Sequence, residues 1–276
     1  MIGIDGWSPA PQETTERIDA APALALAGLL DVEPPVDVLP PLWQWLHFLD
    51  RLPQAALGPD GHPRDGRFLP PIPDRRRMFA GGRCAFHDAI RFGDTITRRA
   101  ELASTVLKQG RSGELLFVTV RLTYLRDGTE IAVEEQDLVY RSGAPDAAPD
   151  AVAVSYEPPE ADGDWLLPFT ADPVSLFRFS ALTYNAHRIH YDAAYATQVE
   201  GHAGLVVHGP LLAILCLELP RRAGLPVREL AFRARRPVYA GQPIVVTGSP
   251  NGDLAVQAPG GVTAVTATFG PAPSND

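Results

Sequence analysis

The sequence is poor in cysteine and in long apolar runs, and it has no excess of positive charge. With only two cysteines, Cys84 and Cys216, neither a disulfide scaffold nor a cysteine metal site is indicated, and a reducing cytoplasm is the expected location. The apolar stretches ALALAGLL and GPLLAILCLEL are shorter than the ~20 residues that cross a bilayer, so no membrane association is expected. The formal net charge of -9 gives no general field for phosphates, so we expect no nucleic-acid partner.

Proline and glycine mark the organisation of the 276-residue chain, with 28 and 24 copies. Residues 142–164 read SGAPDAAPDAVAVSYEPPEADGD, a stretch rich in proline, alanine and aspartate that lacks apolar periodicity. This composition is typical of a linker. It predicts two domains of similar size, residues 1–141 and residues 165–276.

Each half is expected to contain an antiparallel meander. In the first half, residues 83–99 and 101–108 have strand character, and residues 115–125 alternate apolar with polar side chains before a turn at Asp127-Gly128. In the second half, strand-like segments are separated by Asn251-Gly252 and Gly260-Gly261, both typical of hairpin turns. The repetition indicates a duplication.

A closer match between the halves supports the duplication. HDAIRFGDTI and RRPVYAGQPI align without gaps, pairing Gly93 with Gly241 and Ile96 with Ile244, although any two hairpins share part of such a pattern. Each half also has an apolar helix candidate, PPLWQWLHFLDRL in the first and GPLLAILCLELPRRAG in the second. A short helix that is apolar nearly all round should be wrapped by other structure. We therefore predict an α+β double hotdog, two antiparallel sheets that each wrap a central apolar helix.

The most unusual stretch is FRFSALTYNAHRIHYDAAYA, residues 177–196. Seven hydrogen-bonding or titratable residues fall within nine positions there: Tyr184, Asn185, His187, Arg188, His190, Tyr191 and Asp192. Such groups are costly to bury unless they pair, so their clustering indicates a functional site.

Three interpretations of this cluster are open. His190 suits general acid/base chemistry, because the pKa of histidine lies near the working pH. A metal site of His187, His190 and Asp192 is the second, but the helical zinc-protease pattern and a third well-spaced histidine are absent, so no metal is expected. The third is a polar network that caps the following helix. We favour acid/base chemistry.

A second signal is His208-Gly209-Pro210 at the start of the second apolar helix. Proline is favoured in a first helical turn, and glycine lets a ligand approach the backbone closely. The Gly209 N–H at the positive end of the helix dipole would suit a carbonyl oxygen that gains negative charge. A simple Gly-Pro helix start explains the same residues.

The order of polar motif, glycine, apolar helix and meander resembles that of MaoC-like, R-specific enoyl-CoA hydratases. The resemblance is closer to the double-hotdog branch with mesaconyl-CoA and itaconyl-CoA hydratases and hydroxyacyl-thioester dehydratases. It rests on stretches within residues 38–240: PPLWQWLHFL, LGPDGHPRDGRFLPPIP, RRMFAGGR, GRSGELLFVTVR, FRFSALTYNAHRIHYD and LVVHGPLLA. It puts Asn185 at the position of the family's aspartate, His187 at its asparagine, His190 at its catalytic histidine and Gly209 at the glycine whose N–H polarises the thioester.

The resemblance implies reversible addition of water to the double bond of a short, dicarboxylic enoyl-CoA of the mesaconyl or itaconyl type, with no cofactor beyond the CoA of the substrate. His190 would move the proton and Gly209 would stabilise the enolate-like oxygen, while Asn185 cannot be a base and would orient water or substrate. The expected substrate-binding residues are Tyr184, His187, Arg188, His208, Arg178 and Arg235. Of these, Arg178 or Arg188 is the expected partner of a free carboxylate.

Two arginine clusters, Arg75–Arg77 and residues 233–236, are candidates for the CoA phosphates, with solvated charge at strand ends as the alternative. The first half lacks a catalytic motif, and Pro40-Pro41 stands where Gly209-Pro210 stands in the second, with no N–H to donate. That half is expected to keep only an acyl pocket, whose candidate lining is the loop 58–74, Trp43, Trp45, Phe48 and Phe79. A plain aromatic core explains the four aromatic residues equally well.

Two other functions stay open. One is dehydration of 3-hydroxyacyl thioesters in fatty-acid or polyketide metabolism, which uses the same site in reverse. The other is a noncatalytic acyl-binding subunit that retains the fold, because hotdog proteins have several functions. A homodimer is a further expectation from the resemblance.

Overall fold

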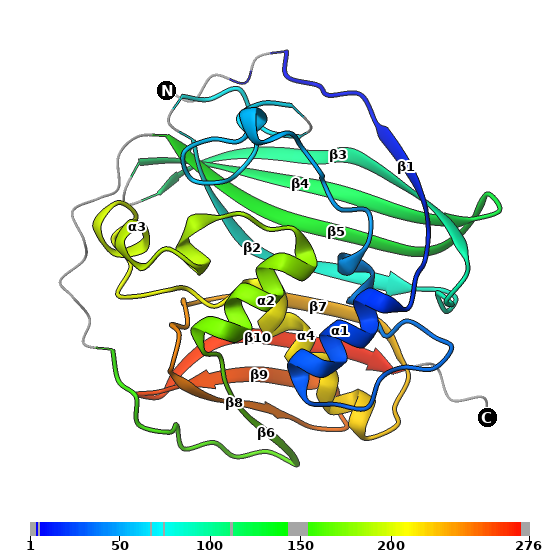
Figure 1. The fold of residues 1–276 in the computed structure, drawn as a ribbon, viewed down its shortest axis with the longest axis vertical. Helices are drawn as coiled ribbons and strands as arrows, with labels where there is room; N and C mark the ends of the chain where they lie inside the picture. The colour runs from blue at the N-terminus through cyan, green and yellow to red at the C-terminus, as the bar shows by residue number, and fades with distance from the viewer. Residues whose placement is uncertain are drawn as a thin grey trace.

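A computed structural model describes residue 4 and residues 6–66, 68–73, 75–110, 113–142 and 154–271. Their strands form one antiparallel sheet in the order β1-β3-β4-β5-β2-β7-β10-β9-β8-β6 (Figure 1). The strands are β1 (Gln12–Arg17), β2 (Arg75–Phe86), β3 (Thr95–Gly110), β4 (Gly113–Arg126), β5 (Thr129–Ser142), β6 (Trp165–Thr170), β7 (Val227–Ala234), β8 (Pro243–Gly248), β9 (Asp253–Ala258) and β10 (Val262–Pro271).

The strand order repeats in the two halves. The first five strands run β1-β3-β4-β5-β2 from the outer edge to the centre, and the last five run β6-β8-β9-β10-β7 in the same relative order. The first set ends at Ser142 and the second begins at Trp165. Residues 143–153 of the expected linker lie outside the described residues. The duplicated arrangement suits two hotdog units joined edge to edge.

The halves join where β2 pairs with β7, from Gly81 opposite Arg233 to Ala85 opposite Glu229. Gly81 has a φ of +143°, and a Cβ there would overlap the main-chain oxygen of Phe232. Only glycine avoids both problems at this position. The glycine therefore permits the close strand pairing that makes the sheet continuous across the halves.

The predicted turns and the aligned segments have the expected geometry. Asp127 and Gly128, between β4 and β5, both have positive φ angles, 50° and 78°, as a two-residue hairpin turn requires. Gly93 and Gly241 have similar φ angles of 93° and 83° and lie just before β3 and β8. The continuous strand predicted over residues 83–99 is wrong at residues 87–94, because the turn that contains Gly93 breaks it.

The helices lie on one face of the sheet (Figure 1). They are α1 (Ala21–Leu30), α2 (Pro173–Thr183), α3 (Ala193–Gln198) and α4 (Gly209–Arg222), with 3-10 turns at Trp43–Leu46, Gln54–Ala56 and Arg188–His190. In the described part of the chain, no helix has both the length and the apolar character that a membrane crossing needs.

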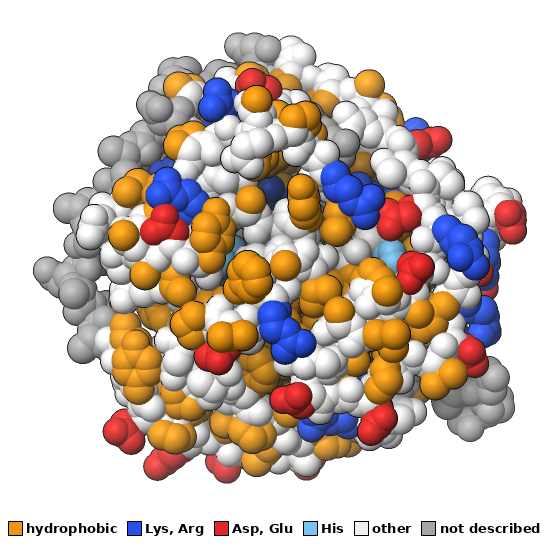
Figure 2. Space-filling view, in the orientation of Figure 1, with side chains coloured by type: hydrophobic (Ala, Val, Ile, Leu, Met, Phe, Trp, Pro, Cys, Tyr) orange, Lys and Arg blue, Asp and Glu red, His pale blue; other side chains and the backbone are white. Residues whose placement is uncertain are grey.

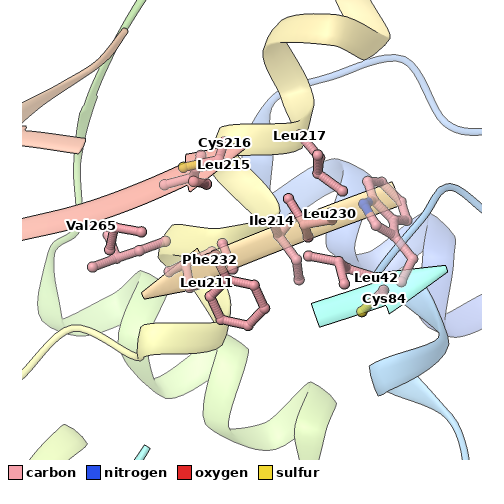
Figure 3. Close-up of a cluster of buried hydrophobic side chains, with 14 of the residues drawn as sticks. Leu42, Cys84, Leu211, Ile214, Leu215, Cys216, Leu217, Leu230, Phe232 and Val265 are labelled. Atoms are coloured by element: carbon pink, nitrogen blue, oxygen red, sulfur yellow. The ribbon is translucent and has the colours of Figure 1, made fainter. Parts of the chain in front are cut away.

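Helix α4 is the predicted central helix of the second half, and this prediction is confirmed. Every side chain from Leu211 to Pro220 is buried. Figure 3 shows Leu211 and Ile214 of α4 packed near Leu230 and Phe232 of β7. Burial on all sides explains why the helix carries no polar stripe.

The helix predicted for the first half, PPLWQWLHFLDRL, is wrong. Only the 3-10 turn at Trp43–Leu46 forms there. Leu42 and Phe48, which flank it, both have left-handed backbone conformations, with φ angles of 71° and 56°, so the chain cannot continue as a helix on either side. The apolar side chains are buried all the same, and the first half has no counterpart of α4 at this point.

Candidate active site

A cavity of about 1000 Å³ is lined by residues from both halves of the chain. The first half contributes the loop around Asp60–Pro63 and the start of β2 from Arg76 to Ala80. The second half contributes the end of α2, the segment 184–191 except Arg188, and the start of α4 at Gly209. The cavity thus brings together Asn185, His190 and Gly209, the three residues predicted to carry the chemistry.

The end of α2 places the polar motif on the cavity wall. The helix is capped at its start by Asp172, whose carboxylate accepts the Ser175 N–H at 2.7 Å. The helix ends at Thr183, and its C-cap residue Tyr184 has a left-handed φ of 50°. The N–H of Asn185 then donates to the Ser180 carbonyl at 2.9 Å. The turn that results directs the following residues along the cavity.

Asn185 lines the cavity, and its side-chain oxygen already accepts one hydrogen bond. The Oδ1 atom accepts the main-chain N–H of His187 at 3.0 Å. This hydrogen bond holds the loop in the tight turn that asparagine side chains commonly support. An amide has no basic lone pair on nitrogen, so Asn185 is not a base, and its oxygen keeps one lone pair for a further hydrogen bond.

His190 has the geometry of a base. Its Nδ1 lies 2.7 Å from the Val206 carbonyl oxygen, and since a carbonyl only accepts, Nδ1 carries the proton. The Nε2 lone pair is therefore free. Burial lowers the pKa of His190 to about 4, which keeps the ring neutral near pH 7. Val206 is itself fixed by donating its N–H to Ile189.

His208 lies behind His190 and is not part of the cavity lining. The two rings are stacked with centroids 3.6 Å apart and an interplanar angle of 18°. His208 Nε2 lies 2.9 Å from the Ser180 hydroxyl, and burial, followed by the charges of His190 and His187, lowers its pKa well below the usual value. From the sequence, His208 is expected to bind substrate. The structure places it outside the cavity lining, as a neutral residue stacked on His190.

Gly209 is the first residue of α4 and lies on the cavity wall. The N–H groups of a first helical turn lack partners within the helix. A Cβ at Gly209 would lie 3.2 Å from Cδ1 of Phe79, so a larger residue would have to displace that ring. The position therefore offers an N–H donor on the cavity wall, and the Phe79 ring leaves little room for a side chain there.

Sequence reasoning missed one pair of residues at the site, Asp60 and His62. The Asp60 carboxylate accepts the main-chain N–H of His62 and also lies 3.0 Å from its Nδ1. The ring of His62 contacts the ring of His187, with centroids 4.1 Å apart. The pair comes from LGPDGHPRDG, a stretch noted only as a loop beside the acyl pocket, in which the Asp-Gly-His spacing was the available signal.

Hydrogen bonds from Arg188 hold the loop of His62 against the segment 184–191. Arg188 donates its N–H to the Asp60 carbonyl at 2.9 Å and its guanidinium to the Pro59 carbonyl at 3.0 Å. A Cβ on Gly61 would overlap the Ala186 carbonyl oxygen. These contacts hold His62 against the second half of the chain.

Three of the histidines at the cavity are neutral near pH 7. Burial lowers the pKa of His62, although its hydrogen bond to Asp60 acts in the opposite direction. Burial, followed by the charges of His62 and His190, lowers the pKa of His187 to about 2. With His190 also neutral, proton acceptors and not cations line this wall.

Asp60, His62 and His187 are also a set that could hold a metal ion, because donor atoms of the three lie within 4.8 Å of one another. In the hydrogen bond between His62 and Asp60, the Nδ1 atom of His62 carries the proton and lies 3.0 Å from the carboxylate. A protonated nitrogen does not ligate a metal. The absence of a metal therefore stays a prediction, and it is tested below.

The remaining predicted binding residues are spread around the molecule. Tyr184, Arg235 and His187 line the cavity. Tyr184 is exposed, whereas His187 is buried. Arg188 is outside the lining, where it pairs with Asp192 at 2.7 Å. Arg178 is exposed on α2 with its guanidinium near Gly28 of α1, also away from the cavity. The last two therefore do not face a ligand in the cavity.

The cavity contains other arginines instead. Arg76, Arg77, Arg141, Arg235 and Arg236 all line it. Arg76 forms an ion pair with Glu200, and its Nη1 is buried without a hydrogen-bond partner among the described residues. Arg77 is half-buried, and within the described ranges no carboxylate or carbonyl is paired with it. Figure 2 shows separate basic side chains among apolar ones on the face that carries the helices.

Of the predicted acyl-pocket residues, Phe79 lines the cavity together with part of the loop 58–74, of which residues 67 and 74 lie outside the described residues. Trp43 and Phe48 are core residues, 1% and 3% exposed. Trp45 donates its indole N–H to the buried carboxylate of Glu134 at 2.7 Å. The aromatic-core interpretation therefore fits these three.

Comparison with known proteins identifies relatives over most of the chain. The family described as hydroxyacyl-thioester dehydratase type 2 matches residues 42–240. The chain is 45% identical over 273 residues to the mesaconyl-C(4)-CoA hydratase of Chloroflexus aurantiacus, with 95% of each chain covered. It is 27% identical over 245 residues to the mitochondrial hydroxyacyl-thioester dehydratase type 2 of Schizosaccharomyces pombe, covering 78% of this chain and 79% of that one.

Solved structures with little sequence identity have the same fold. HtdX of Mycobacterium tuberculosis matches with a TM-score of 0.64 at 16% identity, covering 94% of this chain and 99% of that one. Another Mycobacterium tuberculosis protein, described as having a double hotdog fold, matches with a TM-score of 0.58 at 14% identity over 96% of each chain. The predicted double hotdog fold is confirmed.

Proposed function

This chain belongs to the hydroxyacyl-thioester dehydratase type 2 family and is an acyl-CoA hydratase, and we propose that its substrate is a short dicarboxylic enoyl-CoA of the mesaconyl-C(4)-CoA type. The observation that carries the proposal is a cavity lined by the neutral His190, by Gly209 and by Arg77, which has no ion-pair partner among the described residues. The relative that is 45% identical supports the same substrate class.

The proposed reaction uses His190 and Gly209 as the sequence predicts. The His190 Nε2 takes a proton from water while the water oxygen bonds to the β carbon of the enoyl thioester. The Gly209 N–H donates to the thioester oxygen as it gains negative charge. The protonated His190 then returns the proton to the α carbon. Each of the two contributions is typically worth about 10²–10³ in rate.

Arg77 supports a dicarboxylic substrate. In mesaconyl-C(4)-CoA the free carboxylate is attached to the β carbon of the reacting double bond, so its cationic partner has to lie in the same cavity as the proton-transfer groups. Arg77 is a half-buried cation that lines the same cavity as His62, His187 and His190. A guanidinium binds a carboxylate through two parallel hydrogen bonds.

Two exposed arginines that line the cavity suit the CoA moiety. Arg235 and Arg236 are exposed and line the cavity beyond β7, where they can meet phosphate groups from solvent. Arg235 also donates to the Thr266 hydroxyl at 3.3 Å, which restricts its side chain. Surface arginines of this kind bind phosphate oxygens without selecting the acyl group.

A second candidate function is dehydration of 3-hydroxyacyl thioesters, which the family description and the Schizosaccharomyces pombe relative favour. The same groups catalyse it in reverse, so the site geometry fits both directions. The noncatalytic acyl-binding alternative leaves the free Nε2 of His190 and the open Gly209 N–H without a purpose.

The test is the rate of hydration of mesaconyl-C(4)-CoA, itaconyl-CoA, crotonyl-CoA and a long-chain enoyl-CoA, measured by chromatography of the product thioesters. A kcat/KM at least about tenfold higher for one of the diacid thioesters supports the proposal, since one ion-pair contact at a substrate group is worth on the order of 1.5–3 kcal/mol. Preference for the long-chain substrate supports the dehydratase alternative. No reaction with any of them supports the noncatalytic subunit.

A cytoplasmic location and a homodimer are further proposals. Both cysteines are free and buried, as suits a reducing compartment. The mass in solution, measured by light scattering against the 29.8 kDa of one chain, tests the homodimer.

A further inference from the structure

At residue 185 the second half has an asparagine where the family to which this chain is similar has an aspartate, so the strong second acceptor of that motif is missing from the segment 184–191. His190 Nε2 is open, but the other family position, residue 185, has an asparagine whose Oδ1 already accepts the His187 N–H. Water attacks with one of its lone pairs, so both of its O–H bonds need acceptors to fix its orientation. An imidazole nitrogen is a stronger acceptor than an amide oxygen that already receives a main-chain N–H, so a second oriented histidine on the cavity wall suits this task better than Asn185.

His62 has a free acceptor atom whose position is fixed. The Asp60 carboxylate only accepts, so the 3.0 Å contact places the proton of the neutral His62 on Nδ1 and leaves the lone pair on Nε2. A carboxylate that holds a histidine in this way also orients its ring. His62 lines the cavity, and 19% of its side-chain surface stays accessible.

The position of His62 relative to His190 is fixed through the other residues of the cluster. The His62 ring contacts His187 with centroids 4.1 Å apart, and the His187 ring contacts His190 edge-on at 5.6 Å. The main-chain hydrogen bond from Arg188 to Asp60 and the close packing of Gly61 on Ala186 lock the loop that carries His62. Neither half of the chain contains both acceptors.

We propose that His62, oriented by Asp60, is a second catalytic histidine that accepts one O–H of the attacking water while His190 accepts the other. The inference rests on the proposed hydration reaction. It assigns a catalytic role to the half of the chain that lacks the polar motif, and it explains how the site works with asparagine at position 185.

The step is balanced with these two acceptors. One O–H bond of water breaks and its proton goes to His190 Nε2, while the water oxygen forms a bond to the β carbon and the π electron pair moves toward the α carbon and thioester oxygen. The second O–H bond stays intact as the product hydroxyl and donates to His62 Nε2. The proton on His190 then forms the α C–H bond, which regenerates the neutral enzyme.

The test compares four variants with the wild type on the best diacid thioester: His62→Ala, His62→Gln, Asp60→Asn and, as a control, His87→Ala. His87 is an exposed histidine paired with Glu130 outside the cavity. We expect His62→Ala to lower kcat about 10²-fold with little change in KM, because the lost group acts on water and not on the acyl-CoA. Glutamine retains an acceptor oxygen and should lose less, and Asp60→Asn should lose roughly tenfold.

Added imidazole separates a catalytic role from a structural one. Millimolar imidazole should restore part of the His62→Ala rate, with a pH dependence that follows neutral imidazole. It should not change the wild type, His87→Ala or His190→Ala in the same way. Thermal melting of all variants checks that the fold is retained.

Three results would overturn the inference. They are a His62→Ala rate within about threefold of the wild type, a loss that imidazole does not restore, and a metal ion bound at one per chain whose removal abolishes activity, since that ion would take the His62 lone pair. If the wild type hydrates crotonyl-CoA but no diacid, the proposed substrate fails alone, and the same variants are compared on crotonyl-CoA.

Discussion

Gly61 of the first half packs directly on the Ala186 carbonyl of the second, so closely that a Cβ on the glycine would overlap that oxygen. The contact joins the loop that holds Asp60 and His62 to the loop that holds Asn185 and His190. It is the point at which the two halves become one site.

We predict that Gly61→Ala separates the two loops. The φ of Gly61 is +90°, so alanine brings backbone strain in addition to the overlap. Left-handed strain costs on the order of 1–2 kcal/mol, and a displacement of about 1 Å at a catalytic group costs up to ~10²-fold in rate. The free energy of unfolding and kcat/KM are both measured for this variant.

Gly66→Ala is the matched control. Gly66 has nearly the same φ, +92°, but nothing lies within 4 Å of the position of its Cβ. It should therefore show the strain without the separation, with near-normal kcat/KM. Equal activity losses in the two variants would show that the contact with Ala186 does not position the site.

Gly209→Ala should reduce activity with little effect on folding. The added Cβ would lie 3.2 Å from the Phe79 ring, so this ring, which lines the cavity, has to shift. Alanine is well tolerated in helices, so stability should change little. We expect kcat/KM to fall by roughly tenfold or more.

Combining Gly209→Ala with Phe79→Leu tests the reason for that loss. Leucine gives the alanine methyl more room, so the double variant should be more active than the sum of the two single changes predicts. Strict additivity would show that the Phe79 contact is not the cause.

Arg77→Met should reduce activity on diacid thioesters only. Methionine keeps much of the side-chain volume and removes the cation, so the kcat/KM for mesaconyl-C(4)-CoA should fall by at least about tenfold, while that for crotonyl-CoA stays within a few-fold. Arg178→Met, outside the cavity, is the control and should change neither. A parallel loss on both substrates would contradict the carboxylate assignment.

The pH dependence of kcat/KM should show an acid limb well below that of a free histidine. Activity requires neutral His190, and burial lowers its pKa to about 4, so protonation inactivates the site only as the pH falls toward that value. The profile should therefore be level from about pH 8 to about pH 5.5. A limb near pH 6.5 would show that the catalytic base is not a buried neutral histidine.

Much of the fold follows from local sequence signals. Asp127-Gly128 and Gly93 mark turns that the structure contains, and the apolar residues of α4 are buried on all sides as their pattern predicts. The first-half helix failed because its apolar residues indicate burial and not conformation. The left-handed Leu42 and Phe48 are imposed by packing that no local pattern reveals.

Part of the candidate site could also be predicted from the sequence, and part of it could not. Asn185, His190 and Gly209 lie within one stretch of sequence, and their convergence on the cavity could be predicted from it. The contact between His62 and His187 depends on how the two halves are joined, so sequence spacing does not show it. Arg178 and Arg188 were chosen for their nearness to the motif in sequence, but their side chains face α1 and Asp192.

The most direct test of the central claim is the absorbance loss of mesaconyl-C(4)-CoA with wild type beside His190→Ala. We predict rapid hydration by the wild type and a loss of at least about 10²-fold in kcat in the variant, with its fold intact by thermal melting. A His190→Ala variant that hydrates the substrate at the wild-type rate would contradict the account, because the account assigns the proton transfer to the His190 imidazole.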